Sequence, residues 1–524
     1  MWHGRLAFRK RLILPDVSNN NSRDSNKKMR DLILPISFVG FKLCCMSHSC
    51  MPVPSMGNVS HECARQKCAT TEIDAEMYGP CVVQEGKERV MYVELLKALY
   101  GTVRAARLFW EKLSGKLIEW GFTPNPYDPC VMNKIVEGKQ LTVAWHVDDL
   151  KASHVLSTVV DKFIEDMESE FGKETPINKS RGKVHDYLGM RLDFSKPGEV
   201  TVTMIDYIKA ILHGAPKDMR GRAVTPATTR LFQVNSSNPV YLGEDKAETY
   251  VRIVMQLLFL SQRARPDIRT AVSFLNTRLV QPDEDDYKKL ARVVKYLDTT
   301  VDMPLVLAAD DSGKIRWWID ASFAVHEDMK GHTGGTMSMG KGSIYSTSAK
   351  QKLVTRSSTE AEIVGVHDVL PQLMWTGHFL MEQGFHVKET TLYQDNTSSI
   401  LIEKNGRSSC SKRNRHMNIR YFFIKDQVDS KRVRIEHCPT AEMVADYFTK
   451  PLQGGPFRKL RDFIMNIDPS SKYHSNNSVH RSVLSTESPV VGSSDVTNPD
   501  TSPPRTYKEA LLSSGPSVDV KLTS

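Results

Sequence analysis

The sequence of 524 residues has no long apolar run and few cysteines for its length. Its most apolar early segment, LILPISFVGFKLCC, contains Pro35 and Lys42 and is too short to cross a bilayer. Nine cysteines occur, six of them before residue 82, and this distribution does not suggest a disulfide-stabilised secreted domain. We therefore expect no membrane partner, no secretion, and a reducing cytoplasmic and/or nuclear compartment.

The two ends of the sequence contain few features that predict a fold. Residues 1–71 contain several Cys and His residues, which are possible zinc ligands, but they lack a paired C-x2-C spacing. The segment begins with a basic stretch, MWHGRLAFRKRLIL. Poorly ordered chain is the main prediction there, with a zinc site and an organelle transit peptide as alternatives. The tail, residues 468–524, holds 14 Ser and 6 Pro among 57 residues. Such a composition buries little apolar surface and predicts disorder.

Between these ends the patterns are those of globular chain. Residues 93–122 predict a helix that Gly121 closes, and the apolar positions of residues 285–300 recur at helical spacing. From residue 315 onward, strands and helices alternate after three opening strands, which predicts a mixed sheet with helices on its faces. The expected strands are 315–322, 333–339, 343–347, 390–394 and 432–437, and the expected helices are 357–383, 396–404, 412–429 and 440–449. Gly334 and Gly335, and then Gly340 and Gly342, are expected to punctuate the opening strands.

Four acidic residues in the last third of the chain fall on different predicted elements. Asp320 lies on a strand (IRWWID), and Asp395 lies at the end of another (TTLYQD). Glu362 and Asp446 lie on helices, in SSTEAEIVGV and TAEMVADYFTKPL. Carboxylates brought together from such elements can bind two Mg²⁺ ions about 4 Å apart, the arrangement used to hydrolyse phosphodiesters. We therefore predict that all four are catalytic, metal-binding residues.

Two glutamates compete for the helical position in this set. Glu360 and Glu362 point about 200° apart on a helix, so only one of them can face the ions. Glu362 falls within an apolar stripe that includes Ile363 and Val366, where a carboxylate needs a cation or strong donors. Glu360 has another role available, in a capping box with Ser357. Glu362 is therefore the predicted ligand.

Structural alternatives exist for the other members of the set. Asp320 in isolation could be a surface or turn residue, and Asp395 could be the N-cap of the helix that follows it. Asp446 could be an exposed side chain on a helix that runs from Thr440 to Pro451. His437, just before that helix, could assist substrate handling or product release, or it could be a surface histidine.

A basic stretch follows the third acidic residue. The net charge of the whole chain is +9, and nine Lys or Arg face only two Asp between Arg407 and Arg434. This excess favours a partner rich in phosphate, and the alternative is a solvated basic helix face. The predicted contacts with nucleic acid here are Lys412, Arg413, Arg415, His416 and Arg420.

A second acidic feature is the pair Asp148 and Asp149, between two β-type runs in LTVAWHVDDLKASHV. The pattern predicts a hairpin with the carboxylates at its apex. Considered alone, paired aspartates at a turn are most simply turn residues, because Asp tolerates such backbone conformations.

Eight ordered segments between residues 72 and 467 resemble a known family. They are LLKALYG, HVDDLKASH, YLGMRLDF, ARPDIRTAVSFL, SSTEAE, YQDNTSSI, RHMNIRYFFIKDQV and MVADYFTKPL. Together they are similar to the polyprotein of copia-type LTR retrotransposons. The resemblance implies the carboxyl-terminal part of a reverse transcriptase, an RNA-directed DNA polymerase, followed by a ribonuclease H.

The resemblance implies roles for residues of both the polymerase part and the ribonuclease H part. Asp148 and Asp149 match palm carboxylates that bind Mg²⁺, with His146 in place of the family's tyrosine. Arg104, beside LLKALYG, matches the region that positions template and nucleotide, and YLG matches the region near the primer end. The ribonuclease H motifs match the four acidic residues already identified, Glu362 included.

The resemblance also implies a fold and a division of the chain. We expect a mixed α+β and α/β multidomain protein, with a partial polymerase palm and thumb before a ribonuclease H-like mixed sheet flanked by helices. The predicted parts are an unassigned segment (1–71), a partial palm (72–230), a helical thumb or connection (231–312), a ribonuclease H-like domain (313–467) and the tail (468–524).

One departure from the family affects the polymerase. A third palm carboxylate is expected upstream of ALYG in an Asp-x-x-x-Ala-Phe context, and nothing in residues 1–71 resembles it. Asp74 is acidic but lies too close to ALYG. Protease and integrase segments are also absent, so we interpret the sequence as a truncated or decayed element with polymerase activity absent or feeble.

These observations predict a metal-dependent nuclease. It would use two Mg²⁺ ions per site to cut the RNA strand of RNA–DNA hybrids, and it would also bind single-stranded nucleic acid. Association with itself or with other retroelement chains is a further expectation. The alternative is a remnant that binds nucleic acid without catalysis.

Overall fold

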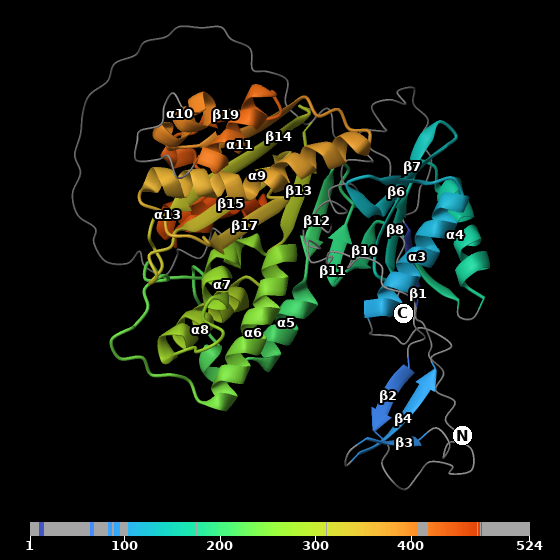
Figure 1. Ribbon diagram of the computed structural model, residues 1–524, viewed down its shortest axis with the longest axis horizontal. Coiled ribbons are helices and arrows are strands. Elements are labelled where there is room, and N and C mark those ends of the chain that lie inside the picture. Colours follow the sequence, from blue (N-terminus) through green and yellow to red (C-terminus); the bar gives the residue numbers. More distant parts are fainter. Residues whose placement is uncertain are drawn as a thin grey trace.

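The computed structural model describes residues 103–173, 176–310, 312–406, 418–468, 470–471 and 473 (Figure 1). It also gives the backbone of four earlier strands, β1 (Lys10–Leu14), β2 (Cys63–Lys67), β3 (Val82–Glu85) and β4 (Glu88–Glu94). The predictions for the rest of the first 102 residues and for the tail beyond residue 473 lie outside the described residues. No helix in the described part of the chain has both the length and the hydropathy needed to cross a bilayer.

The first sheet is built mainly from a meander with two helices packed on it. Its strand order is β5-β6-β7-β8-β1-β9. The new strands are β5 (Thr123–Asn125), β6 (Asp128–Val136), β7 (Lys139–His146), β8 (Asp149–Ser153) and β9 (Ile177–Arg181). The helices α3 (Val103–Glu119) and α4 (Ser157–Phe171) bury their apolar stripes, including Leu113, Phe163 and Met167, in one core with Val143 of the sheet. Helical spacing of apolar residues therefore places both helices on this sheet.

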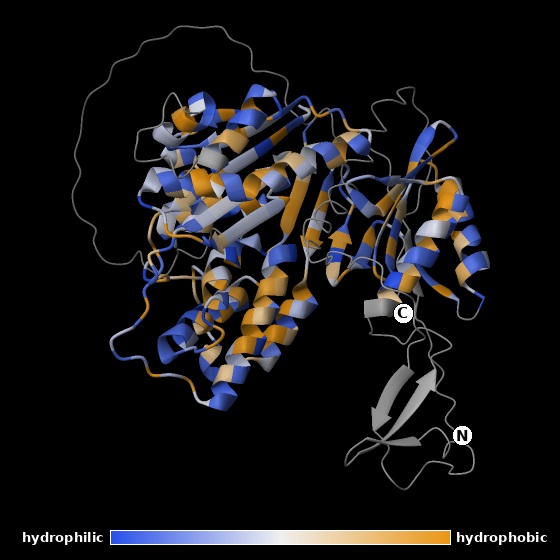
Figure 2. Ribbon diagram, viewed as in Figure 1, coloured by the Kyte–Doolittle hydropathy of each residue, from blue (hydrophilic) through white to orange (hydrophobic). Residues whose placement is uncertain are grey.

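A second sheet connects this unit to a helical layer. Its strand order is β10-β11-β12-β13-β16, with β10 (Val184–Tyr187), β11 (Met190–Asp193), β12 (Glu199–Thr203), β13 (Leu305–Ala309) and β16 (Gly340–Lys341). The helices are α5 (Ile205–Gly214), α6 (Glu244–Arg263), α7 (Arg269–Asn276) and α8 (Glu284–Thr299), and a short turn η3 (Pro266–Ile268) joins α6 to α7. In Figure 2 these helices carry orange apolar faces, as expected for elements that share a large core.

The third sheet carries the predicted acidic residues. Its order is β17-β15-β14-β18-β19, formed by β14 (Lys314–Ser322), β15 (His332–Ser338), β17 (Tyr345–Lys350), β18 (Glu389–Gln394) and β19 (Arg434–His437). The first three strands are antiparallel, whereas β14, β18 and β19 run parallel. This is the mixed sheet that the sequence predicts. The accompanying helices are α9 (Ser358–Glu382), α10 (Thr397–Asn405), α11 (Asn418–Asp429), α12 (Asp446–Thr449) and α13 (Gly454–Met465).

Helices α9 and α12 lie on opposite faces of this third sheet. A Cβ atom on Gly335 would come 3.6 Å from Val369 of α9, whereas one on Gly334 would come 2.6 Å from Thr449 of α12. Because successive strand residues point to opposite faces, the two glycines separate the two helices. Figure 1 shows α9 running across the sheet.

Two local predictions and one structural alternative need correction. The single helix expected at 440–449 is a 3₁₀ turn, η6 (Thr440–Glu442), followed by the separate α12, because Met443 takes an extended conformation between them. The glycine pair 334–335 does not end a strand but lies inside β15. Asn396, rather than Asp395, is the N-cap of α10, since its side chain accepts from the N–H of Ser399 at 3.1 Å.

Candidate acidic metal site

Strand register brings the first two carboxylates together. The parallel strands β14 and β18 pair as far as Trp318 with Tyr393. Asp320 and Asp395 each follow two residues later, so they lie at corresponding positions near the carboxyl ends of neighbouring strands. This end of a parallel pair is where open sheets bind ligands.

Helix α9 brings Glu362 to the same place. Ser357 is the N-cap of α9 and accepts a hydrogen bond from the N–H of Glu360. The Glu360 carboxylate accepts from the N–H of Arg356 at 2.8 Å, one residue before the expected capping-box partner. The two glutamates therefore have different surroundings, because Glu362 lies with Asp320 and Asp395 instead.

Asp320, Glu362 and Asp395 form a compact acidic group. Each offers one carboxylate oxygen within 4.8 Å of the others, and Asp320 and Glu362 are buried. Among the described residues this is the only such group of three or more His, Cys, Asp or Glu. Asp446, at the start of α12, interacts electrostatically with Asp320 and Asp395 and is 9% exposed. We call these four residues the acidic quartet.

Mutual repulsion and burial make Glu362 and Asp446 costly to charge. Burial, with the negative charges of Asp320 and Asp395, raises the pKa of Glu362 well above its ordinary value. Burial and the charge of Asp320 raise the pKa of Asp446 to about 6, although Lys450 opposes the shift. Carboxylates shifted in this way are expected where acids are crowded together for a chemical purpose.

The quartet fits the requirements of divalent cations. One carboxylate oxygen of Glu362, Oε2, is buried and has no hydrogen-bond partner among the described residues. The N–H of Ala321 hydrogen-bonds the same carboxylate. A buried oxygen without a donor needs a cation or a proton, and hard oxygen ligands suit Mg²⁺. The residues present therefore fit a divalent-cation site in donor type, spacing and charge.

Three neighbouring residues complete the surroundings of the quartet and were not identified from the sequence. The Nζ atom of Lys450 lies 2.6 Å from Asp446 Oδ1 and 3.6 Å from Asp320 Oδ2. The hydroxyl of Thr449 donates to Asp320, and that of Thr440 donates to Asp395 at 3.0 Å. The i,i+4 spacing of Asp446 and Lys450 was an available signal for this ion pair.

A fifth carboxyl lies behind the quartet. Glu403 of α10 is fully buried beside Gln394, and burial raises its pKa. The negative charge of Glu403 also raises the pKa of Glu362. It is not part of the compact group, so we treat it as a neighbour of the quartet.

The described part of the basic stretch is largely engaged in local pairs. Lys425 contacts Asp429 at 2.6 Å, and Arg434 contacts Glu389 at 3.2 Å and Glu436 at 2.6 Å. Arg420 is half-buried on α11. The other predicted contacts, Lys412, Arg413, Arg415 and His416, lie outside the described residues.

The predicted hairpin at the second acidic feature is confirmed as a structure. Strands β7 and β8 pair through His146 and Asp149, so Val147 and Asp148 form the tight turn. Asp149 is buried, Asp148 is half-buried, and Val147 has a positive φ of 56°. Within the described residues no third carboxylate joins this pair in a metal-binding group. The side chain of Arg104 is not among those described.

Several titratable side chains lie beside this hairpin. Burial and the charge of Arg263 lower the pKa of His146, although Asp148 opposes the shift. Burial, with the charge of Asp149, raises the pKa of Tyr187 well above its ordinary value. Tyr187 begins the YLG segment, so that segment lies beside the aspartate pair.

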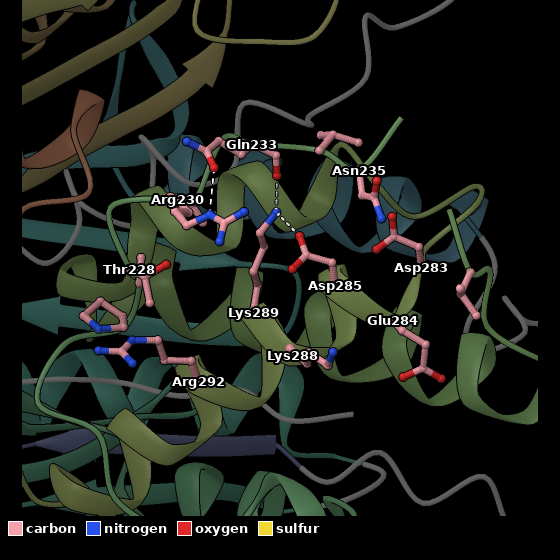
Figure 3. Close-up of a pocket in the computed structure, with 15 residues that line it drawn as sticks. Thr228, Arg230, Gln233, Asn235, Asp283, Glu284, Asp285, Lys288, Lys289 and Arg292 are labelled. Atoms are coloured by element: carbon pink, nitrogen blue, oxygen red, sulfur yellow. Dashed lines mark hydrogen bonds and ion pairs between the residues drawn. The ribbon is translucent and has the colours of Figure 1, made fainter. Parts of the chain in front are cut away.

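A separate cavity of about 770 Å³ lies between the segment at 226–240 and α8 (Figure 3). Its cations are largely engaged with the protein itself. Lys289 donates to the carbonyl of Gln233 at 2.5 Å and pairs with Asp285 at 2.8 Å, while Arg230 donates to the Gln233 side chain at 2.8 Å. None of the quartet lines this cavity.

Comparison with known proteins supports the predicted resemblance. Residues 68–227 match the family model described as "Reverse transcriptase (RNA-dependent DNA polymerase)". The Pol polyprotein from transposon TNT 1-94 of Nicotiana tabacum is 26% identical over 380 residues, covering 71% of this chain and 28% of that protein. That from transposon RE1 of Arabidopsis thaliana is 28% identical over 382 residues, covering 71% and 25%. The chain thus spans about a quarter of the length of these relatives.

Solved structures with some similarity include two kinds of enzyme. A ribonuclease H1 isolated from compost is 15% identical, with a TM-score of 0.21, and covers 26% of this chain and 92% of that one. The protease–reverse transcriptase of prototype foamy virus is 14% identical, with a TM-score of 0.20, covering 73% and 43%. The family match and the sequence relatives confirm the resemblance to copia-type LTR retrotransposon polyproteins.

Proposed function

We propose that this chain, which resembles copia-type polyproteins, is a metal-dependent nuclease that cuts the RNA strand of RNA–DNA hybrids. The observation that carries the proposal is the acidic group of Asp320, Glu362 and Asp395 within 4.8 Å. Asp446 joins it electrostatically, and a buried oxygen of Glu362 lacks a donor. A buried cluster of this kind is unfavourable without bound cations, which supports a role in holding them.

Each part of the site has a role in this proposal. Two Mg²⁺ ions, when bound, would supply an activated water and stabilise the leaving oxygen. Cleavage would therefore leave a 3′ hydroxyl on the product. Asp320, Glu362, Asp395 and Asp446 would hold the ions. Thr449 would orient the Asp320 carboxylate, and Lys450 would neutralise part of the charge of Asp446 until the ions bind.

The proposed substrate partner is a hybrid duplex, with single-stranded nucleic acid as a second partner. The basic stretch would contact phosphates through Lys412, Arg413, Arg415, His416 and Arg420, which predicts binding that weakens steeply with salt. Association with itself or with other retroelement chains belongs to the same proposal.

The experiment is cleavage of an end-labelled RNA–DNA hybrid by the purified chain with Mg²⁺. Asp395→Asn and Glu362→Gln should each reduce the rate by at least about a hundredfold, because each removes an ion-binding carboxylate. Glu360→Gln is the matched control, since Glu360 bonds the N–H of Arg356, and its rate should stay within about threefold of the parent.

Other outcomes would contradict the proposal. Cleavage that survives both ligand changes would place the site elsewhere, and loss with Glu360→Gln alone would reverse the choice of glutamate. Salt-sensitive hybrid binding without cleavage by the parent would favour the alternative function, a nucleic-acid-binding remnant without catalysis.

For the palm segment we propose that Asp148 and Asp149 are the remnant of a polymerase metal site. Residues 68–227 match the reverse transcriptase family, and the paired aspartates lie at a tight hairpin beside Tyr187. Two-metal nucleotide transfer needs a further carboxylate. We therefore propose that RNA-directed DNA polymerase activity is absent or feeble in this chain.

A further inference from the structure

Helix α12 is too short to hold its own shape, yet it carries Asp446 of the quartet and Thr449, which donates to Asp320. It consists of four residues, Asp446 to Thr449. So short a helix is marginal in isolation, and its last carbonyls have no partner within the helix. Whatever satisfies those carbonyls fixes the direction in which the Asp446 side chain points.

Three hydroxyl groups from three other elements satisfy these carbonyls. Thr270 of α7 donates to the carbonyl of Tyr447 at 2.7 Å, and Ser348 of β17 donates to that of Phe448 at 2.7 Å. Ser322 of β14 donates to the carbonyl of Thr449 at 3.2 Å. Two of these donors belong to the third sheet, but Thr270 lies 44 residues before Lys314, where the first strand of that sheet begins.

The turn before α7 holds α12 by a second contact. The Tyr447 hydroxyl donates to the carbonyl of Asp267 at 3.0 Å. Asp267 is itself fixed, because Arg265 binds both of its carboxylate oxygens at 2.9 and 2.7 Å, and Tyr296 donates to it at 2.8 Å. Arg265 is fully buried and also donates to Thr300. A bidentate pair with all its hydrogen bonds made is a rigid support.

A buried histidine pair fixes the Ser348 donor. His332 Nε2 lies 2.7 Å from the Ser348 hydroxyl, and His332 Nδ1 lies 3.0 Å from His326 Nε2. Since the Ser348 proton goes to the Phe448 carbonyl, His332 must donate through Nε2 and accept at Nδ1. Ser273 of α7 donates to the carbonyl of Ser348. Helix α7 therefore supports α12 directly through Thr270 and indirectly through Ser348.

We propose that Thr270 and the buried turn from Arg265 to Asp267 are positioning residues for Asp446. The nuclease site would then be completed by α7 and η3, which lie in the segment expected to be thumb or connection, and not by residues 313–467 alone. This inference rests on the proposed function for its biological meaning. Its physical content is that a hydroxyl outside the third sheet sets the metal affinity of the quartet.

The test compares metal binding by three full-length variants. Thr270→Val removes the hydroxyl and keeps the shape, whereas Thr270→Ser keeps the hydroxyl. Thr277→Val is the matched control at the C-terminal end of α7, because its hydroxyl bonds the carbonyl of Phe274 in that helix. Mn²⁺ affinity is measured by titration calorimetry, and hybrid cleavage is measured on the same samples.

Thr270→Val should bind Mn²⁺ about tenfold more weakly than the parent, the loss typical of a support removed behind a ligand. Thr270→Ser and Thr277→Val should stay within about twofold. The pair Asp148 and Asp149 is unchanged in every variant, so a difference between them reports on the quartet. Equal affinity in Thr270→Val and Thr277→Val would overturn the inference.

A second variant keeps the test decisive if Thr270→Val does not fold by circular dichroism. Tyr447→Phe removes only the hydroxyl that contacts Asp267, and it should weaken Mn²⁺ binding in the same direction. Unchanged affinity in folded Tyr447→Phe would contradict the inference. A parent that binds Mn²⁺ with the expected differences but cuts no hybrid would refute the proposed function and leave the positioning role standing.

Discussion

Glu362 and Glu360 lie two positions apart on α9, but their carboxylates meet different surroundings. Glu360 bonds a backbone N–H at the start of the helix, whereas Glu362 faces Asp320 and Asp395 and has one oxygen without a donor. The helical period of 100° per residue predicts this difference from the sequence. What the period does not predict is how far burial and neighbouring charges raise the pKa of Glu362.

That raised pKa leads to a prediction about stability. The unfolded chain loses the Glu362 proton near pH 4.5, and the folded chain loses it only at higher pH, so stability falls as pH rises above about 4.5. Glu362→Gln should therefore raise the Tm of the metal-free protein near neutral pH, and this gain should shrink toward about pH 4.5. Calorimetric melting in a chelator, over a pH series, measures the difference.

Excess Mg²⁺ should reverse the order of the two proteins. The parent gains stability from ligand binding, and Glu362→Gln lacks that gain. Glu360→Gln should follow the parent in both conditions. If Glu362→Gln is less stable than the parent in chelator near neutral pH, the crowding of the quartet has been overestimated.

Lys450 gives a second prediction at this scale. Its ammonium group lies 2.6 Å from Asp446 and 3.6 Å from Asp320, so it neutralises part of the quartet in the absence of metal. Lys450→Met should lower the metal-free Tm, because it leaves carboxylates without a counter-charge. The same variant should bind Mn²⁺ more tightly, since a competing cation is gone.

The matched control for this variant is Lys425→Met, which breaks a similar i,i+4 pair, with Asp429 on α11. It should leave Mn²⁺ affinity unchanged. Weaker Mn²⁺ binding by Lys450→Met would show that Lys450 supports the ligands and does not compete with the ions.

At the scale of elements, the close approach of α12 to β15 depends on a glycine. A Cβ atom at Gly334 would meet Thr449 at 2.6 Å and Phe448 at 2.8 Å, so one of the two elements must shift. Gly334→Ala should destabilise the fold by about 1–3 kcal/mol, the usual cost of overpacking. It should also weaken Mn²⁺ binding, because the displaced helix carries Asp446.

Gly335→Ala provides the comparison on the other face of β15. Its Cβ atom would meet Thr347 at 3.2 Å, a contact that a small side-chain movement can relieve. We expect a smaller loss of stability and no change in Mn²⁺ affinity. Equal effects of the two substitutions on affinity would mean that the position of α12 does not control the site.

Local sequence patterns predicted most helices and strands of the third sheet, but not the geometry of its end. Apolar spacing, the Ser357 cap and strand alternation are all local signals, and α9, β14 and β18 fall within a few residues of the expected bounds. Helix α12 was expected as one helix from residue 440. Its true form depends on Thr270 and Ser348, which lie 177 and 100 residues away and leave no local pattern.

At the scale of the whole molecule, α9 links the acidic quartet to the first sheet. Trp375 donates to the carbonyl of Tyr127 at 2.9 Å, and His378 stacks on the Tyr127 ring at 5.2 Å. Asn125 donates to the carbonyl of Phe379 at 3.3 Å. The first sheet is therefore in direct contact with α9, the helix that packs on the third sheet. No motif in the sequence predicts this contact.

The palm segment allows a prediction about polymerase activity. The purified chain should not extend a primer on an RNA template, because no third carboxylate joins Asp148 and Asp149 in a metal-binding group in the described part of the chain. Gel analysis of primer extension with Mg²⁺ measures this. Extension that disappears in Asp148→Asn would show that the polymerase site is complete.

The central claim is that four carboxylates far apart in sequence bind two divalent ions together. Anomalous diffraction from crystals of the chain soaked in Mn²⁺ tests it most directly. Two peaks about 4 Å apart are expected, bound by Asp320, Glu362, Asp395 and Asp446, and neither peak is expected in Glu362→Gln crystals. A soaked parent crystal with no peak among these four side chains would contradict it.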